Sequence, residues 1–171
     1  MPFRVKGGMD TPIPYISRSE ADTEKLARYL ASLLLPGDAV FLDGDLGMGK
    51  SVFARELIRT ATDMPDMDVP SPTFTLVQIY DTDTAPIWHF DLYRIKTPEE
   101  VWELGWEDAL QDIILVEWPS RLGSGLAPAN RLALGFQQDN QGSDNRIITI
   151  TPMGAWKKRW DQSAFEQALS P

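Results

Sequence analysis

Residues 43–51 read Asp43-Gly44-Asp45-Leu46-Gly47-Met48-Gly49-Lys50-Ser51, which matches the phosphate-binding pattern G-x-x-x-x-G-K-[ST] at every fixed position. A polyphosphate needs several backbone N–H groups in one concavity, and glycines let the backbone approach the oxygens without an intervening Cβ. The pattern predicts that Lys50 reaches the β- and γ-phosphates and that the Ser51 hydroxyl binds Mg²⁺. The alternative is a glycine-rich turn that only caps a helix.

The residues on either side of this loop predict a buried strand before it and a helix after it. Ala39-Val40-Phe41-Leu42 is a short apolar run that follows the turn residues Pro36-Gly37-Asp38. After the loop, apolar residues recur near helical spacing at Val52, Phe53, Leu57 and Ile58. We therefore expect an α/β fold of the P-loop NTPase type, a three-layer sandwich in which helices flank a mixed, mostly parallel central sheet.

Length, cysteine content and the distribution of apolar residues narrow the class of protein. With 171 residues we expect a single domain over 1–171, with an irregular lead-in to about residue 18 and a C-terminal helix from about residue 155. The chain has no cysteine, which excludes disulfides and thiol catalysis and suits a reducing cytosol. No apolar stretch follows Met1–Lys6 and no run approaches membrane-spanning length, so we expect an unprocessed, soluble, cytoplasmic protein without a membrane partner.

The net charge of -9 bears on nucleic-acid binding. Lys and Arg contacts to phosphates dominate the affinity of proteins for nucleic acids. We therefore expect any link to RNA to run through a partner protein. The charge can equally serve solubility alone.

Helix and strand signals follow one another along the rest of the chain. Ser19, followed by acidic residues, predicts the N-cap of a helix that ends at Pro36-Gly37. Two apolar runs on either side of a polar turn predict an antiparallel hairpin. Including that hairpin, the expected strands are 76–80, 87–94, 113–118, 131–137 and 146–151, and the expected helices begin at Ser19, Thr97 and Ala155.

Two acids stand at the ends of apolar strands. Asp91 has the position of a Walker-B carboxylate, which holds Mg²⁺ directly or through water at the carboxyl edge of the sheet. Glu117 ends the next apolar run and is the second candidate for a metal ligand or water-orienting acid. The alternative for Glu117 is a surface charge at a strand end. Trp118 beside it is a candidate for stacking on the base, for covering the site, or for ordinary packing.

Hydroxyls and one histidine lie near these acids in the sequence. Ser71, Thr73 and Thr75 follow the first helix after the loop, where a γ-phosphate sensor would sit, although turn hydroxyls at a strand entry explain them equally well. His89, the only histidine of the chain, shares a strand face with Asp91. We favour a hydrogen-bonded packing residue over a catalytic base for His89.

Four blocks of sequence together resemble the TsaE family, also called YjeE, the bacterial P-loop ATPases of tRNA threonylcarbamoyladenosine synthesis. The loop by itself is generic, whereas the H-x-D-x-Y-R and L-V-E-W blocks are specific in combination. The resemblance covers about residues 19–151. The blocks are Gly44 to Ser51, Ser71 to Val77, His89 to Arg94 and Leu115 to Trp118.

The resemblance implies an accessory ATPase that uses ATP and Mg²⁺ and does not itself transfer the carbamoyl group. Such a protein binds the complex of the TsaD transferase subunit with its paralogue TsaB and supports repeated rounds of modification at adenosine 37 of tRNA. It meets tRNA only indirectly, through these partners.

The resemblance also implies roles for individual residues. Asp91, Glu117 and Thr73 would be catalytic, with Thr73 in a switch-like segment, and the metal ligands would be Ser51, Glu117 and Asp91. The family commonly has Ala and Thr where this chain has Met48 and Ser51, but the hydroxyl and the backbone that bind are retained. The nucleotide would contact Thr23 near the base, then Asp45, Leu46, Gly47, Met48, Gly49, Lys50, Ser51, Val52 and Trp118.

Other P-loop proteins remain as alternatives. A small-molecule kinase usually carries an arginine-rich lid, and the sequence has no such segment. A GTPase usually needs an Asn-Lys-x-Asp stretch, which is absent. A non-catalytic switch that only gates assembly is the third alternative, and turnover with and without partner proteins separates it from an ATPase.

Overall fold

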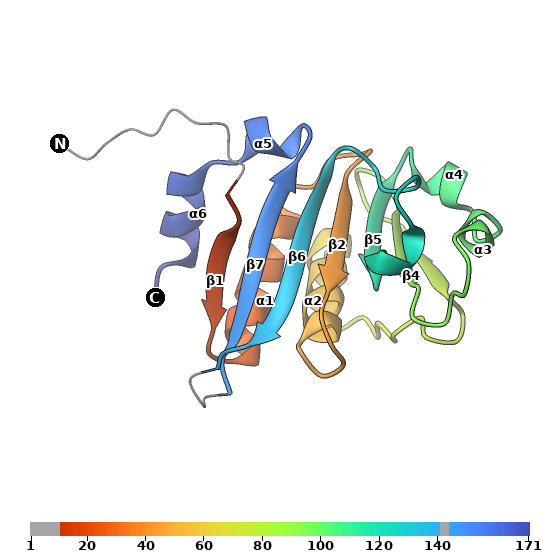
Figure 1. Cartoon of the computed structure of the whole chain (residues 1–171). Helices are drawn as coiled ribbons and strands as arrows, with labels where there is room; N and C mark the ends of the chain where they lie inside the picture. Colours follow the sequence, from red (N-terminus) through yellow and green to blue (C-terminus); the bar gives the residue numbers. More distant parts are fainter. Residues whose placement is uncertain (1–10, 141–143) are drawn as a thin grey trace.

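The computed structural model describes residues 11–140 and 144–171, in which one seven-stranded sheet carries helices on both faces (Figure 1). The strand order is β1-β7-β6-β2-β5-β4-β3. The strands are β1 Ile13–Ser17, β2 Ala39–Asp43, β3 Val77–Tyr80, β4 Ile87–Asp91, β5 Ile113–Glu117, β6 Arg131–Gln138 and β7 Arg146–Met153. The helices are α1 Glu20–Ala31, α2 Lys50–Thr62, α3 Glu99–Trp102, α4 Trp106–Ala109, the 3₁₀ helix η1 Pro119–Leu122, α5 Trp156–Arg159 and α6 Gln162–Leu169.

The sheet is mixed, and its centre is parallel. Strand β2 pairs in parallel with β5 and with β6, and β4 pairs in parallel with β5. The antiparallel pairs lie toward the edges: β3 with β4, the expected hairpin, and β7 with both β6 and β1. Strands β1, β2, β4, β5 and β6 therefore point the same way. This confirms the expected α/β class with its mixed, mostly parallel sheet.

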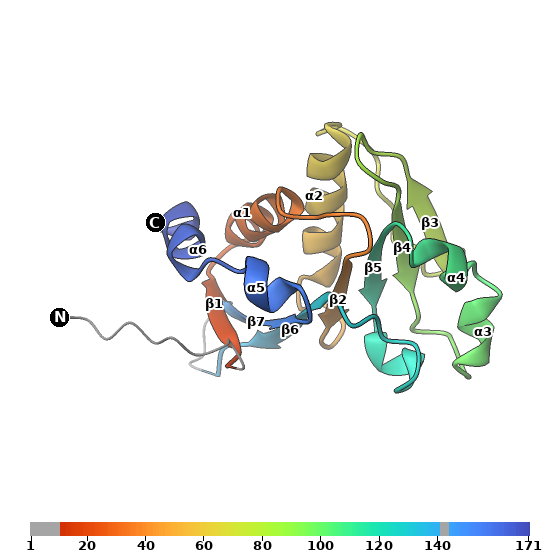
Figure 2. The ribbon, with the colours of Figure 1, turned by 90° about the horizontal axis from the view of Figure 1, so that it is seen from above.

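Two apolar clusters lie on opposite faces of the sheet. On one face α1 and α2 pack through residues such as Leu26 and Phe53 (Figure 2). On the other face α3, α4 and η1 cover mainly β4, β5 and β2, around the fully buried Trp106, and Val77 of β3 and Ala133 of β6 pack at the margin of this cluster. Strand β5 is accordingly buried along its length, whereas burial alternates along β6 and β7. The sandwich thus has three layers over half of the sheet and two over the other half.

The expected helix over residues 155–169 is two helices. Trp160 has an extended backbone, and the side chain of Asp161 accepts a hydrogen bond from the Ala164 N–H and so caps α6. The Trp160 ring packs against Phe165, with ring centroids 5.0 Å apart. Burying Trp160 at the bend and capping a new helix at Asp161 interrupt the helical pattern that the sequence predicts.

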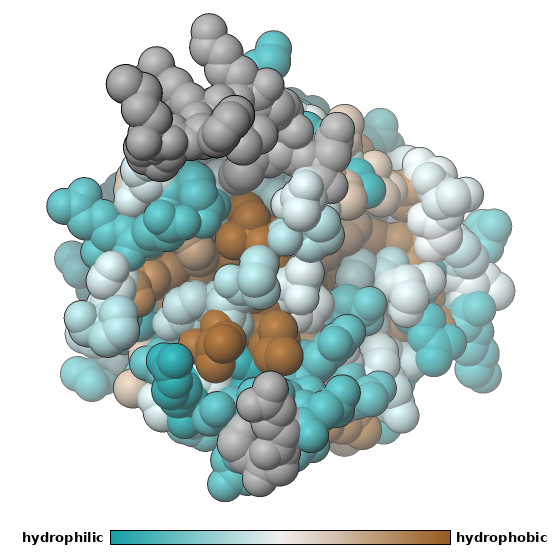
Figure 3. All heavy atoms as spheres, turned by 60° about the vertical axis from the view of Figure 1, so that its left-hand side comes forward, coloured by the Kyte–Doolittle hydropathy of each residue, from teal (hydrophilic) through white to brown (hydrophobic). Residues whose placement is uncertain are grey.

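The N-terminal expectations are tested only in part. The short strand expected before residue 18 is β1, while Met1–Lys6 lies outside the described residues, as do residues 141–143 between the expected strands 131–137 and 146–151. Within the described part, no helix has both the length and the apolar character needed to cross a membrane. Seen from the side of β1, the surface carries small hydrophobic patches separated by hydrophilic side chains (Figure 3).

Candidate nucleotide site

The loop between β2 and α2 has the backbone that phosphate binding requires. Gly44, Gly47 and Gly49 have φ angles of 142°, 78° and 104°, which favour glycine. A Cβ on Gly44 would lie 2.5 Å from the carbonyl oxygen of Phe136, so the loop can pass β6 only as glycine. Within residues 11–140 and 144–171, the N–H groups of 45–49 find no hydrogen-bond acceptor. These donors are available to an anion.

Lys50 is folded back onto this loop. Its Nζ donates to the carbonyl of Gly44 and, at 2.8 Å, to the carbonyl of Asp45. The same atom lies 4.5 Å from the centroid of the Trp118 ring. Burial lowers the pKa of Lys50 below its ordinary 10.5, and nearby carboxylates, first that of Glu117, oppose the shift. The lysine is therefore a cation held in a partly desolvated place without a paired carboxylate, which favours an anionic ligand.

The two predicted acids lie beside the loop. Asp91 and Glu117 end the parallel neighbours β4 and β5, are register partners, and are 4% and 3% exposed. Both face a cavity of about 470 Å³ that also receives Lys50 and Ser51. The structure thus brings the predicted metal ligands and the lysine to one place. The other residues that line this cavity are Glu20, Leu46, Gly47, Gly49, Val52, Ser71, Thr73, Tyr93 and Trp118.

Asp91 is held by the segment that contains the predicted sensor. The hydroxyls of Ser71 and Thr73 each lie 3.3 Å from its Oδ2, and the Tyr93 N–H donates to its Oδ1 at 3.0 Å. Thr75 points elsewhere, because its hydroxyl accepts a hydrogen bond from the Gln78 amide. Two of the three candidate hydroxyls therefore meet the strand-end acid, and the third does not.

Glu117 and Trp118 have different partners. His89 places Nε2 3.0 Å from Glu117 Oε1, so His89 is the buried, hydrogen-bonded residue that we favoured. Trp118 has a left-handed backbone, with φ 61°, and its ring lies against the Tyr93 ring at 4.9 Å between centroids. With Lys50 beneath it, this half-buried ring lines the cavity and also packs against the apolar cluster around Trp106.

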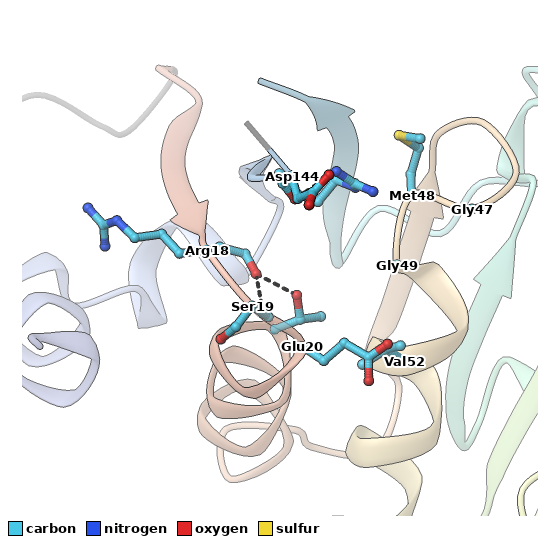
Figure 4. A pocket seen from close by; sticks show the side chains of 11 residues that line it. Arg18, Ser19, Glu20, Gly47, Met48, Gly49, Val52 and Asp144 are labelled. Atoms are coloured by element: carbon cyan, nitrogen blue, oxygen red, sulfur yellow. Dashed lines mark hydrogen bonds between the residues drawn. The ribbon is translucent and has the colours of Figure 1, made fainter. Parts of the chain in front are cut away.

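A second cavity, of about 250 Å³, adjoins the first and shares Glu20, Gly47, Gly49 and Val52 with it. Thr23 lies here, 4% exposed, with its hydroxyl 2.7 Å from that of Ser17. Figure 4 shows Glu20 reaching from α1 toward α2, whereas the Arg18 side chain extends away from the loop. The other lining residues are Ser17, Arg18, Ser19, Met48, Asp144 and Arg146.

The two cavities together place the predicted contacts of a nucleotide on a continuous path. Ser51 and the two acids line the larger cavity, and Thr23 and Met48 line the smaller one. Asp45 departs from this pattern, because it lines neither cavity and contributes its carbonyl to Lys50 instead.

The donor set suits Mg²⁺. Among the described residues there is no group of three or more His, Cys, Asp or Glu side chains placed to hold a metal. Mg²⁺ commonly uses one or two carboxylates and completes its shell with waters and substrate phosphates. The site offers such ligands: two carboxylates, Asp91 and Glu117, and the hydroxyl of Ser51 beside a phosphate-binding loop.

Two residues that line the larger cavity were not predicted from the sequence. Glu20 lines both cavities from the start of α1, and its sequence signal was only that of an acidic first-turn residue. Tyr93 also lines the larger cavity, and its ring is tilted against the Trp118 ring. Its place in the H-x-D-x-Y-R block, two residues after Asp91, was the signal that pointed toward it.

A glycine loop between a buried strand and a helix, with a lysine at the helix start, defines an α/β protein of the P-loop NTPase-like class. A family model described as "Threonylcarbamoyl adenosine biosynthesis protein TsaE" matches residues 17–148. The chain belongs to the TsaE family, and the expected resemblance is confirmed.

Individual relatives agree with this assignment. The tRNA threonylcarbamoyladenosine biosynthesis protein TsaE of Rickettsia felis is 46% identical over 114 residues, which is 66% of this chain and 66% of the relative. The chain thus spans just under two thirds of that relative's length. The TsaE of Rickettsia bellii is 45% identical over 137 residues, 80% of this chain and 92% of the relative. The crystal structure of Bacillus subtilis YdiB has a TM-score of 0.70 at 26% identity and covers 90% of this chain and 93% of its own.

Proposed function

We propose that this protein binds and hydrolyses Mg-ATP as an accessory subunit of tRNA threonylcarbamoyladenosine biosynthesis, acting on a complex of TsaB- and TsaD-type partners. Membership of the TsaE family supports the pathway. The observation that carries the ATPase proposal is the convergence of Lys50, Ser51, Asp91 and Glu117 on one cavity.

The loop and Lys50 would bind the phosphates. The unpaired N–H groups of residues 45–49 supply donors, and the N-terminus of α2 adds a favourable dipole. Lys50 already lies in the cavity with its charge turned to the loop carbonyls. A bound anion would draw its Nζ from those carbonyls to the phosphate oxygens.

The strand-end acids and the hydroxyl would hold the metal. Ser51 opens α2, and Asp91 and Glu117 face it from β4 and β5. Mg²⁺ held by these residues would neutralise charge on the phosphate oxygens. Thr73, whose hydroxyl lies at Asp91, is the proposed link between this site and the segment that follows α2.

The smaller cavity would take the adenosine end. Met48 and Val52 give this cavity apolar lining, and Thr23 gives it a hydroxyl. Trp118, which lines the larger cavity, would exclude water from the phosphates.

The test is calorimetric titration of the purified protein with ATP and Mg²⁺, followed by measurement of inorganic phosphate release. We expect binding by the isolated protein and faster release when the TsaB–TsaD complex is added. No binding would refute the nucleotide site. Binding without phosphate release, even with the partners, would leave a nucleotide-dependent assembly switch.

A second measurement tests the partners. Tagged protein should retain the TsaB–TsaD complex in a pull-down to an extent that differs with and without ATP. Equal absence of retention in both conditions would overturn the partner proposal while leaving the nucleotide site intact. Transfer of labelled phosphate to a small molecule, instead of its release, would indicate a kinase.

A further inference from the structure

His89 is buried in the middle of β4, with 1% of its surface exposed, and lines neither cavity of the nucleotide site. Its register partner in β5 is Leu115, two residues before Glu117. Side chains two residues apart on a strand share a face, so His89 and Glu117 project from the same side of the sheet. Their contact, Nε2 to Oε1 at 3.0 Å, joins the buried sheet to the mouth of the larger cavity.

We propose that His89 is a positioning residue that fixes the Glu117 carboxylate for metal binding. The inference rests on the proposed function, in which Glu117 is a ligand of Mg²⁺. A hydrogen bond between a ring nitrogen and a carboxylate needs one proton, and an imidazole N–H donor supplies it at Nε2. Because Oε1 of Glu117 accepts the hydrogen bond from His89, Oε2 is the oxygen that remains to bind a metal in the cavity.

The two acids differ in how much support they receive. Asp91 accepts from two hydroxyls and from the Tyr93 N–H. Within the described residues, the carboxylate of Glu117 accepts a hydrogen bond from His89 and from no other group. Glutamate has one more rotatable bond than aspartate, so removing this donor frees the carboxylate to leave the position that a metal requires.

The other ring nitrogen indicates why a histidine stands here. Nδ1 of His89 is buried without a hydrogen-bond partner in the described structure. A buried, unpaired polar atom destabilises a folded protein, and an apolar residue of similar size would avoid that penalty. Packing alone therefore does not explain the imidazole, whereas a donor for Glu117 does.

Three substitutions separate positioning from packing. His89→Leu keeps apolar bulk and removes the donor. His89→Gln places its amide nitrogen close to where Nε2 lies, and His89→Asn reaches only as far as Nδ1. The measurement is the Mg²⁺ concentration dependence of binding of a fluorescent ATP analogue, with binding in EDTA and the melting temperature recorded for each variant.

We expect the apparent Mg²⁺ affinity to fall about tenfold or more in the Leu and Asn variants, the range seen when a group supporting a metal ligand is lost. The Gln variant should stay near the wild type, and binding in EDTA should be the same for all. In a Glu117→Ala background, His89→Leu should have no further effect on Mg²⁺ dependence, because the ligand to be positioned is gone.

Unchanged Mg²⁺ affinity in His89→Leu, with only the melting temperature lowered, would overturn the proposal. If the Leu variant does not fold, the Gln and Asn pair decides, and equal Mg²⁺ affinity in those two would also overturn it. Absence of Mg²⁺-dependent nucleotide binding in the wild type would instead refute the proposed function itself.

Discussion

Asp91 and Glu117 are register partners at the carboxyl ends of the adjacent parallel strands β4 and β5. Both carboxylates are almost fully buried, and both face the cavity that holds Lys50. Two buried acids side by side repel each other unless a cation shares their space. Lys50 supplies one positive charge, and a divalent metal would supply the remainder, which ties the acids, the lysine and the proposed metal into one electrostatic unit.

Lys50→Ala should abolish ATP binding. The phosphates would lose the cation in a partly desolvated place, which costs about 2–5 kcal/mol, so affinity should fall about 30-fold or more. Calorimetric titration with ATP measures this. Lys96→Ala removes the same charge from an exposed position outside both cavities and should bind as the wild type does. Unchanged affinity in Lys50→Ala would refute its role.

Glu117→Ala should impair Mg²⁺-dependent hydrolysis more than nucleotide binding. We expect phosphate release to fall about 100-fold, as when one electrostatic contact to a transition state is lost, and Mg-ATP affinity to fall less, by about tenfold, because one metal ligand is lost. Steady-state phosphate release and titration measure the two effects. Glu103→Ala, an exposed acid, is the control. Equal hydrolysis by the Glu117 variant would remove that residue from the mechanism.

Two substitutions should separate the negative charge of Asp91 from its role as hydrogen-bond acceptor for the segment that contains Ser71 and Thr73. Asp91→Asn keeps an oxygen for the hydroxyls of Ser71 and Thr73 but loses the charge, whereas Asp91→Ala loses both. Both variants should hydrolyse ATP slowly, and only the Ala variant should show faster amide hydrogen exchange over residues 71–76. Identical exchange in the two variants would show that Asp91 does not hold this segment.

Gly44→Ala should destabilise the protein. Its φ of 142° disfavours other residues, and the added Cβ would lie 2.5 Å from the Phe136 carbonyl oxygen. Strain and overpacking together should lower the free energy of unfolding by about 2–5 kcal/mol, measured by urea denaturation. Gly135→Ala, where a Cβ meets no atom within 4 Å, should change it by less than about 1 kcal/mol. Similar values for the two variants would contradict the close approach of the loop to β6.

Much of the fold could be predicted from local patterns. The strand before the loop, α2, the antiparallel hairpin and the Ser19 cap of α1 all have signals within a few residues of one another. The bend at Trp160 had no comparable signal, because it depends on a ring that packs against Phe165. Nothing in the sequence indicated that helices cover only half of the second face of the sheet, because this depends on which strands lie beneath α3, α4 and η1.

The candidate site likewise contains residues that local sequence predicts and residues that it does not. A phosphate loop is contiguous, so its glycines, Lys50 and Ser51 are recognisable from nine consecutive residues. Glu20 reaches the cavities from a different helix, and nothing near it in the sequence distinguishes it from an ordinary first-turn acid. Residues that meet only through strand order or helix packing carry no local sign of the meeting.

The sequence by itself determined the glycine loop, its lysine and the family to which the chain belongs, because these depend on residue types at fixed spacing. Only the tertiary structure decided that β4 and β5 are neighbours in register, that Ser71 and Thr73 meet Asp91, and that His89 meets Glu117. The physical reason is that backbone pairing between distant strands sets which side chains share a face and an edge, and that pairing is selected by burial over the whole sheet.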